Sequence, residues 1–436
     1  MLKQSFKKLV VFVLRFESRL YLRKYRPKII AVVGSVGKTS TKDAIYRVLQ
    51  AGGFSVRKSE KSYNSDFGVP LTILGCGSAW NDPLGWLEIM LYGLRRLLSR
   101  QPYPEWLVLE VGLEYPGEIK QIVGWVKFDL VVMTLLPEVP VHVEFFESRE
   151  SIIAEKMLPA LSVPSSGLVF LNADDANQLQ FTPELKAKII TYGRSANADY
   201  QVSGSGEVVY SGTNTDRIPT GLGFELKHDD QIAKVFVPGV IGEHQIYPIL
   251  AALALGREIG FRLGMMIDSL KDYLPPPGRL RLIAGLKDTV ILDDTYNSSP
   301  AALAAALATL AELAVAGRKI AVIGDMMQLG NFTVSAHKEI GYRAAKICDL
   351  VVTVGLRAKF IDEALREKKY SAKKIKHFDD ALSAGQYLQT VIKPGDVILF
   401  KASQAVRLEK AVEEIMLQPE AKAKLLARQD PEWQNR

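Results

Sequence analysis

The stretch from residue 29 to residue 46 constrains the fold more than any other part of the chain. A run of apolar, mostly β-branched residues, 29–33, breaks at Gly34, and a helical pattern begins at about Lys38 and Thr39. A strand, a glycine loop and a helix in this order bind phosphate, because the glycines let backbone N–H groups turn toward an anion. Lys38 adds a positive charge for the outer phosphates, and Thr39 adds a hydroxyl for Mg²⁺. The stretch therefore predicts a nucleoside triphosphate site.

This phosphate loop is a shortened variant of the usual one. The full P-loop pattern has a glycine five positions before Gly37, where this chain has Val32. A glycine turn with a solvated lysine is the alternative interpretation, and the agreement of strand, loop, hydroxyl pair and helix disfavours it. We expect the nucleotide to contact seven consecutive residues: Gly34, Ser35, Val36, Gly37, Lys38, Thr39 and Ser40.

Length and cysteine content limit the class of protein. A chain of 436 residues with 48% hydrophobic content is too long for one ordinary core, so two or three domains are expected. The two cysteines, Cys76 and Cys348, lie far apart and form no CxxC pair. Their placement argues against a disulfide framework and a cysteine-rich zinc site, and it fits a reducing cytoplasm.

Positive charge is concentrated at the start of the chain. Residues 1–28 contain nine lysines and arginines against Glu17 alone, a net charge of +8, although the whole chain carries +7. A nucleic-acid-binding protein would more often spread its basic residues over a folded face, so no nucleic-acid partner is expected. The longest apolar run here, 9–14, is too short to span a bilayer.

Apolar residues at helical spacing among these basic residues predict an interfacial helix over 1–24. We expect it to bind the anionic inner face of the membrane loosely, which gives a cytoplasmic protein with peripheral membrane contact. A helix that docks on the rest of the protein is the alternative. A second amphipathic helix, over 84–99, is open to the same two interpretations.

The remaining pattern predicts an α/β protein. Buried-strand candidates at 106–111, 130–134 and 167–171, separated by helical stretches, indicate a mostly parallel sheet. Short alternating runs between 199 and 240 suggest a small antiparallel sheet. After a linker at 275–278, strands and helices alternate again, as in a doubly wound domain. We expect four regions: a basic amphipathic N-terminal helix (1–28), a central ATP-binding domain (29–277), a C-terminal Rossmann-like domain (278–418) and a polar tail (419–436).

Polar side chains follow several of the predicted strands. Glu110 ends the strand at 106–111, and His142 follows the strand at 130–134 after a short loop. Ligands of open α/β sheets collect beyond the carboxyl ends of the strands, so these two side chains are candidates for holding Mg²⁺ against phosphate oxygens. In the last domain, the acids 293–294 and the residues 401–403 occupy equivalent positions.

Short motifs along the chain resemble those of the Mur ligases, the ATP-dependent amide-forming enzymes of peptidoglycan precursor synthesis. The phosphate loop looks like that of the family, and residues 63–71 (YNSDFGVPL) look like the Y-N-N-E-x-G-V-P-L of its MurF type, which adds D-alanyl-D-alanine. Further matches follow in the family's order: 109–112 (LEVG), 116–119 (PGEI), 141–146 (VHVEFF), 171–175 (LNADD), 242–244 (GEH), 277–279 (PGR), 293–297 (DDTYN), 324–326 (GDM) and 401–403 (KAS). The block at 293–297 favours the MurF type over other branches.

The resemblance implies ATP and Mg²⁺ as cofactors and assigns roles residue by residue. It implies catalytic roles for Lys38, Glu110, His142 and Lys156. It implies metal ligation by Thr39, Glu110, His142 and Lys156, the lysine after carbamylation by CO₂. The positions that match contacts to adenine and ribose are Gln245, Arg279 and Asp294. Those that match substrate contacts are Asn64, Asn297, Lys401, Ser403 and Gln404.

Some positions depart from the family pattern. Gln245 replaces an asparagine, residues 401–404 read KASQ in place of KGSR, and Ser65 and Asp66 replace asparagine and glutamate. Family members also carry a domain before the loop that holds the uridine nucleotide, and the 28 residues found here cannot build one. We therefore expect weaker binding of the uridine nucleotide than in family members.

The resemblance implies that the enzyme phosphorylates the terminal carboxylate of a muramoyl-tripeptide and joins it to D-alanyl-D-alanine. The acceptor would be a muropeptide nucleotide or a lipid-linked precursor. Three alternatives stay open: a related ligase with another acceptor or amine, a P-loop kinase or GTPase, and a non-enzymatic scaffold. A complete second Rossmann-like domain speaks against the kinase or GTPase, and retention of Lys38, Glu110 and His142 speaks against the scaffold.

Overall fold

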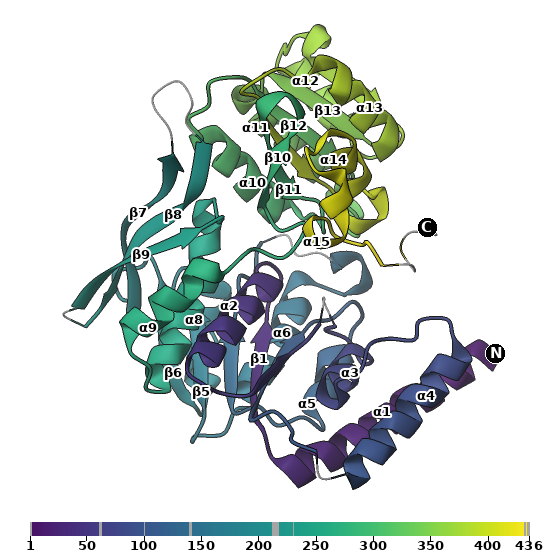
Figure 1. Ribbon diagram of the computed structural model, residues 1–436, viewed down its shortest axis with the longest axis vertical. Helices are drawn as coiled ribbons and strands as arrows, with labels where there is room; N and C mark the ends of the chain where they lie inside the picture. Colours follow the sequence, from purple (N-terminus) through teal and green to yellow (C-terminus); the bar gives the residue numbers. More distant parts are fainter. Residues whose placement is uncertain are drawn as a thin grey trace.

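Two sheet-based domains lie one above the other, and a pair of helices projects from the lower one (Figure 1). The computed structural model of the protein describes residues 2–60, 63–99, 101–138, 142–211, 218–229, 231–430 and 433. Val141 of the motif at 141–146 lies outside the described residues, as do residues 431, 432 and 434–436 of the predicted polar tail.

The central domain is built on one sheet of nine strands. They are β1 (Lys28–Val33), β2 (Val56–Lys58), β3 (Trp106–Val111), β4 (Leu130–Met133), β5 (Leu168–Asn172), β6 (Lys188–Gly193), β7 (Tyr200–Ser211), β8 (Ile218–His228) and β9 (Gln231–Pro238). Their order is β2-β3-β1-β4-β5-β6-β7-β8-β9, and β1 pairs in parallel with both β3 and β4. The loop after β1 therefore emerges at the same edge as the residues that follow β3 and β4.

The antiparallel segment is part of this sheet, whereas the sequence suggested a small sheet. Strands β7, β8 and β9 pair in antiparallel fashion as expected, but β7 also pairs in parallel with β6 through Tyr192 and Tyr200. Strand β6 was not predicted because only half of its residues are buried, so it lacks a continuous apolar run.

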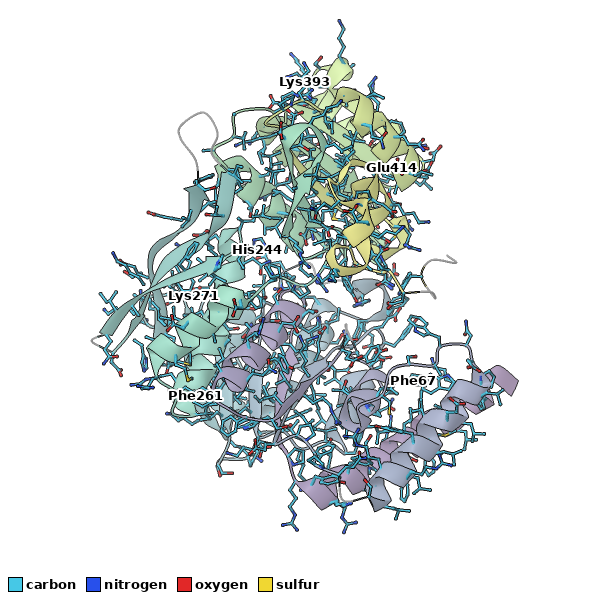
Figure 2. The ribbon with its side chains drawn as sticks, in the orientation of Figure 1. Phe67, His244, Phe261, Lys271, Lys393 and Glu414 are labelled. Atoms are coloured by element: carbon cyan, nitrogen blue, oxygen red, sulfur yellow. The ribbon has the colours of Figure 1, made fainter. Side chains whose placement is uncertain are left out.

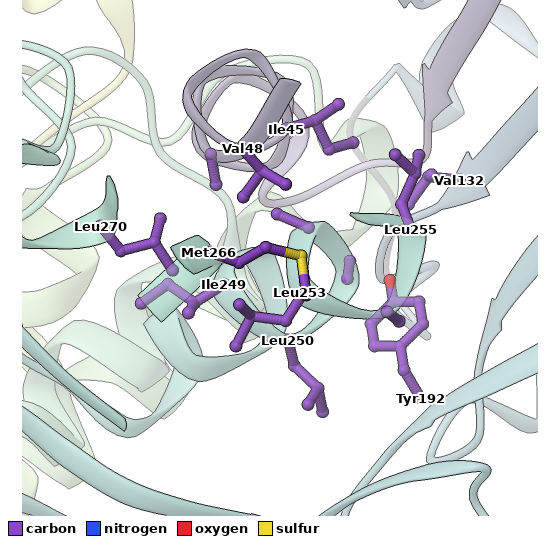
Figure 3. Close-up of a cluster of buried hydrophobic side chains, with 14 of the residues drawn as sticks. Ile45, Val48, Val132, Tyr192, Ile249, Leu250, Leu253, Leu255, Met266 and Leu270 are labelled. Carbon is purple, nitrogen blue, oxygen red and sulfur yellow. The ribbon is translucent and has the colours of Figure 1, made fainter. Parts of the chain in front are cut away.

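The helices of the central domain cover both faces of the sheet. They are α2 (Lys38–Ala51), α3 (Gly68–Leu74), α5 (Glu118–Val123), α6 (Arg149–Leu161), α7 (Ala176–Leu179), α8 (Ile246–Glu258) and α9 (Leu263–Ser269). Helix α8 packs against α2, and Val48, Ile249, Leu253 and Met266 meet in the core between them (Figure 3). Gly256 of α8 permits the close approach, because a Cβ atom there would lie 2.6 Å from the side chain of Val48 in α2 and 2.3 Å from the sulfur of Met266 in α9.

The C-terminal domain has a six-stranded sheet in the order β10-β11-β15-β12-β13-β14, parallel except for β10. Its strands are β10 (Arg281–Gly285), β11 (Thr289–Asp294), β12 (Lys319–Gly324), β13 (Leu350–Val354), β14 (Ile375–Phe378) and β15 (Val397–Lys401). Its helices are α10 (Pro300–Glu312), α11 (Thr333–Ile347), α12 (Lys359–Glu367), α13 (Ala381–Val391), α14 (Glu409–Ile415) and α15 (Lys422–Leu425). The predicted second α/β domain is confirmed. The described part of the tail packs on this domain: Arg428 is buried and pairs with Glu409.

The N-terminal segment forms α1 (Leu2–Tyr25), which contacts α3 and α4 (Pro83–Leu98). Helices α1 and α4 lie side by side at the edge of the central domain, on the side remote from the C-terminal domain (Figure 1). One face of α1 buries Val10, Leu14 and Tyr21 against the protein, and Phe12 on another face is 70% exposed. Docking on the protein and exposure of an apolar face thus occur together. No described helix is long and apolar enough to cross a membrane.

Candidate functional site

The phosphate loop between β1 and α2 depends on its two glycines. Gly34 has a φ of 143°, and a Cβ atom on it would lie 2.1 Å from the hydroxyl of Thr134. Gly37 has a φ of 88° and immediately precedes the first turn of α2. Both positions favour glycine, because other residues rarely adopt such backbone angles and because a side chain at residue 34 would collide with Thr134, directly after β4. The loop and the amino end of α2 together form an anion-binding geometry.

Lys38 folds back over this loop. Its Nζ donates hydrogen bonds to the carbonyl oxygens of Gly34 at 2.9 Å and Ser35 at 3.3 Å. Removal from water lowers the pKa of the ammonium, while the nearby carboxylate of Glu110 raises it. The cation is therefore held beside the loop, where phosphate oxygens would become its counter-charge.

Glu110 is the centre of a polar cluster at the end of β3. The Thr39 hydroxyl donates to its Oε2 at 3.1 Å, and the Asn64 side-chain amide lies 3.5 Å from its Oε1. Lys42, one turn further along α2, places its Nζ 3.6 Å from the same carboxylate. Since Glu110 is 1% exposed, these partners replace the water that a buried carboxylate would otherwise lack.

His142 and Lys156 face the phosphate loop from two other elements. Lys156, in α6, is buried and donates from Nζ to the Ser35 hydroxyl at 2.7 Å. Burial, together with the charge of Lys38, lowers the pKa of Lys156 to about 7. Burial, with the charges of Lys156 and Lys38, lowers the pKa of His142 to about 4, so the imidazole is neutral at physiological pH. Its Nδ1 is buried without a hydrogen-bond partner among the described residues.

These residues suit a magnesium ion that takes most of its ligands from elsewhere. Within the described ranges no group of three or more His, Cys, Asp or Glu side chains converges. Mg²⁺ is usually held by one or two carboxylates, with phosphate oxygens and water completing the shell, rather than by an all-protein cage. The Glu110 carboxylate, the Thr39 hydroxyl and the unsatisfied Nδ1 of His142 fit that pattern.

A cavity of about 280 Å³ opens over the phosphate loop between the two domains. Of the predicted nucleotide-binding residues, it is lined by Ser35, Val36, Gly37, Lys38, Thr39, Ser40, Gln245, Arg279 and Asp294. His244, where the central domain meets the C-terminal domain, lines it too (Figure 2). The Gln245 side-chain amide donates to the carbonyl oxygen of Arg279 at 3.3 Å, which links the two domains.

A second cavity, of about 300 Å³, is also lined by the loop lysine, Lys38. Among the predicted site residues it is lined by Gly34, Ser35, Lys38, Asn64, Glu110, His142, Lys156, Arg279, Asn297 and Gln404. The two cavities share five lining residues: Ser35, Lys38, Glu110, Arg279 and Asn297. A group at this shared border would be reachable from both sides.

Lys401 and Ser403 differ in where they lie. Lys401 lines the first cavity, and its Nζ pairs with the Asp294 carboxylate at 2.6 Å and donates to the carbonyl oxygen of Asn297 at 3.0 Å. Ser403 lines neither cavity, and its hydroxyl accepts a hydrogen bond from the backbone N–H of Met327 at 2.9 Å. A substrate contact by Ser403 stays a prediction.

Three further contacts link the domains around the site. A guanidinium nitrogen of Arg279 lies 3.4 Å from the Thr39 hydroxyl. Gln328 donates from its side chain to Glu114 at 3.1 Å and accepts from the backbone N–H of His142 at 3.2 Å. Residues of both domains line both cavities, for example Lys38 of the central domain and Arg279 of the C-terminal domain.

Several lining residues were not predicted as site residues. The first cavity also contains Asn172, Asp174, Tyr192 and Tyr247. Asn172 and Asp174 lie in and just after β5, so the strand-end rule that identified Glu110 could have identified them. The aromatic residues carried no comparable signal. Neither did Lys42, because its contact with Glu110 depends on the packing of α2 against β3.

The chain is similar to known proteins over most of its length. Residues 90–256 match the Mur ligase middle domain, and residues 278–404 match the Mur ligase glutamate ligase domain. The UDP-N-acetylmuramoyl-tripeptide--D-alanyl-D-alanine ligase of Bacillus subtilis (strain 168) is 29% identical over 404 residues, covering 92% of this chain and 79% of the relative. The ligase of the same description from Escherichia coli (strain K12) is 27% identical, covering 91% and 78%. The crystal structure of MurF ligase from Thermotoga maritima in complex with ADP superposes with a TM-score of 0.74 at 27% identity, covering 93% of this chain and 83% of the other.

Proposed function

We propose that this chain adds D-alanyl-D-alanine to a muramoyl-tripeptide and hydrolyses ATP to ADP in doing so. The basis is that the chain belongs to the Mur ligase family and is of the MurF type. The product is an amide-bonded precursor of peptidoglycan, and ADP and phosphate are released. The observation that carries the proposal is the pair of cavities that meet at Lys38 and Glu110. A ligase of this type needs a nucleotide and a carboxylate substrate on opposite sides of the transferred phosphoryl group.

The reaction proceeds in two balanced steps. A carboxylate oxygen of the peptide attacks the γ-phosphorus of ATP, and the bond to ADP breaks to give an acyl phosphate. The amine of the dipeptide then attacks the acyl carbon, inorganic phosphate leaves, and the amine loses a proton. Both steps depend on charge neutralisation and positioning rather than on a covalent enzyme intermediate.

The nucleotide side of the site consists of the phosphate loop and three residues at the domain junction. Gly34 to Ser40 surround the phosphates, with Lys38 at the transferred group. Gln245, Arg279 and Asp294 contact adenine and ribose. Thr39, Glu110 and His142 hold Mg²⁺, which when bound supplies positive charge at the phosphate oxygens.

Lys156 extends the metal site after carbamylation. Its amine is the nucleophile: a bond forms between Nζ and the carbon of CO₂, and the proton leaves to water. The pKa of about 7 keeps much of this buried amine neutral at physiological pH, as the reaction requires. The resulting carbamate is an anion, and its oxygens would suit a divalent cation such as Mg²⁺ as ligands.

The amine side of the site lies across the domain boundary. Asn297 and Gln404 line the second cavity together with Asn64 of the central domain. Lys401 and Ser403 adjoin them on the C-terminal domain. We assign these five residues to the two substrates, with the dipeptide on the C-terminal domain.

The partners and location follow from the reaction. The acceptor is a muropeptide nucleotide or its lipid-linked form, and ATP use places the enzyme in the cytoplasm. Helix α1, with its exposed Phe12, makes a peripheral contact with the inner face of the membrane.

The test is ADP release measured together with mass detection of the amide product. With UDP-muramoyl-tripeptide and D-alanyl-D-alanine, release requires both substrates and matches product mole for mole. Lys38→Ala lowers kcat/KM by about 10²–10³-fold, whereas Lys120→Ala, at an exposed lysine of α5, leaves it unchanged. A phosphorylated product without an amide would favour a kinase. A preference for meso-diaminopimelate or L-lysine would favour another branch of the family.

A further inference from the structure

The exposed apolar side chains of this protein gather on two helices. Of the 22 large hydrophobic residues that are exposed in the described part of the chain, ten lie on α1 and α4. Those on α1 are Phe6, Leu9, Phe12 and Phe16. Those on α4 are Leu84, Leu87, Leu91, Tyr92, Leu94 and Leu98. A gathering of exposed apolar side chains on one part of a protein surface marks an interaction site.

Helices α1 and α4 run parallel to each other. Glu17 packs against Gly93, where a Cβ atom would lie 2.3 Å from its Oε2. The Tyr21 hydroxyl donates to the carbonyl oxygen of Gly93 at 2.8 Å, and one turn further Lys24 reaches the carbonyl oxygen of Leu97. Contacts advance along both helices in the same direction, and Figure 1 shows the two side by side.

The two apolar stripes lie on the same side of this pair. An α-helix turns about 100° per residue. Around the axis of α1, in the direction in which the chain winds, the apolar stripe around Leu9 comes first and the face toward α4, at Glu17, comes next. The face toward α3, where Ser18 contacts Pro70, follows. Around the axis of α4, in the same direction, the face toward α1, at Gly93, comes first and the leucine stripe around Leu91 comes next. For two parallel helices this order brings both stripes to the side that faces away from α3.

Basic residues flank this face. The two helices contain nine lysines and arginines and only two acids, Glu17 and Glu88, so their net charge of +7 equals that of the whole chain. Lys8, Arg19 and Arg23 are exposed beside the stripe of α1. An apolar stripe flanked by cations is the pattern of a helix that lies in the interface of an anionic membrane.

We propose that the α1–α4 face is a docking surface for an anionic lipid bilayer. It deepens the peripheral contact of α1 proposed above by adding α4, and it does not depend on the ligase reaction. A second copy of the chain is a poorer occupant, because a symmetric dimer through this face would bring two surfaces of net charge +7 together. The aromatic and leucine side chains enter the headgroup region, and the basic residues contact lipid phosphates.

Helix α1 also contacts the segment that carries Asn64 of the second cavity. Arg15 pairs with Asp66 at 3.2 Å, and the Lys7 ammonium lies 5.3 Å from the ring centre of Phe67. The Phe67 ring packs against Trp86 of α4 at 5.6 Å between ring centres, and Figure 2 shows Phe67 beside the helix pair. The docked face therefore holds the acceptor side of the enzyme close to the lipid surface.

Vesicle flotation of the full-length protein tests the apolar part of the surface. At low salt the protein floats with vesicles of phosphatidylglycerol and phosphatidylcholine and stays at the bottom with phosphatidylcholine alone. Phe16→Ser/Leu84→Ser lowers the partition coefficient at least tenfold. The matched control is Leu356→Ser/Leu417→Ser on the C-terminal domain, because its two residues have the same exposed fractions of 72% and 54% as Leu84 and Phe16. The control floats like the wild type.

The charge contribution is tested with Lys8→Gln/Arg19→Gln/Arg23→Gln. At roughly 1 kcal/mol for each basic residue at the surface, this triple variant loses roughly 100-fold in partition coefficient. Raising the salt concentration to 0.5 M lowers the wild-type value toward that of the triple variant.

Three results would overturn the proposal: no flotation of the wild type with anionic vesicles, equal flotation of the apolar variant and its control, or a dimer in light scattering that Phe16→Ser/Leu84→Ser abolishes. The last result would assign the face to a second copy of the chain. Ligation of soluble substrates without vesicles is measured in parallel. If it persists in the serine variants while flotation fails in the wild type, the lipid surface is wrong and the ligase function stands.

Discussion

Glu17 is a buried carboxylate in the α1–α4 contact, and Glu17→Gln should stabilise that contact in a pH-dependent way. The side chain is 5% exposed, and its Oε2 has no hydrogen-bond partner among the described residues. Burial raises its pKa from 4.5 to about 7. Between these two values the folded protein keeps a proton that the unfolded chain has released, so stability falls as the pH rises through this range. Above pH 7 the folded protein bears the full free-energy cost of the ionised, buried Glu17 carboxylate.

The magnitude follows from the two pKa values. The ionised form costs about 3 kcal/mol at pH 8 and under about 1 kcal/mol at pH 5. Glutamine has nearly the same shape and does not ionise, so Glu17→Gln should recover most of this difference. We expect the variant to exceed the wild type by about 2–3 kcal/mol at pH 8, with little difference at pH 5.

Native-state hydrogen exchange of the α1 and α4 amides is the suitable assay. It reports the opening free energy of these helices, whereas a protein of two domains need not unfold in one step. Glu88→Gln, at an exposed glutamate of the same helix pair, is the control and should change neither value. A gain that is equal at both pH values, or a loss at pH 8, would refute the reasoning.

Three further variants test the active site. Gly34→Ala should abolish nucleotide binding in calorimetry, because its Cβ atom would lie 2.1 Å from the Thr134 hydroxyl; unchanged affinity would contradict the tight loop geometry. Lys42→Met should lower kcat/KM about tenfold, because Glu110 would lose a charged partner at 3.6 Å, and Lys120→Met is the exposed control; equal kinetics in the two variants would remove Lys42 from the site. Lys156→Ala should lose bicarbonate-dependent activity. In the wild type at limiting bicarbonate the rate should fall as the pH drops through about 7, since protonation removes the amine that reacts with CO₂; a rate independent of bicarbonate would disprove carbamylation.

The local parts of the site could be predicted from the sequence. The β1 strand, the glycine loop and the start of α2 follow one another directly, so hydrophobic pattern and residue type were enough. Glu110 was found in the same way, because it ends a continuous apolar strand. Strand order was harder: β15 lies between β11 and β12, and this insertion sets Asp294 opposite Lys401. No local pattern encodes that register.

Which charged side chains are buried could not be predicted from the sequence either. Lys42 and Lys156 occupy helices in which lysine usually faces water, yet both are buried. Their environments depend on which strands and loops pack against α2 and α6. The exposed face of the α1–α4 pair lies between these cases: its helical spacing was readable, but only the packing shows which residues are covered by α3 and by each other.

The contacts between the domains lie at unequal distances along the chain from the linker at 275–278. Arg279 is adjacent to the linker and touches Thr39, whereas Gln328, which touches Glu114 and the His142 backbone, lies some fifty residues further on. If the C-terminal domain turned about this linker, Arg279, which is next to the linker, would move little, and residues that are farther from the linker in space would move more. A turn large enough to separate the Gln328 contacts would then leave Arg279 near the phosphate loop. Such a movement would let peptide substrates exchange at the second cavity while the same nucleotide stays bound.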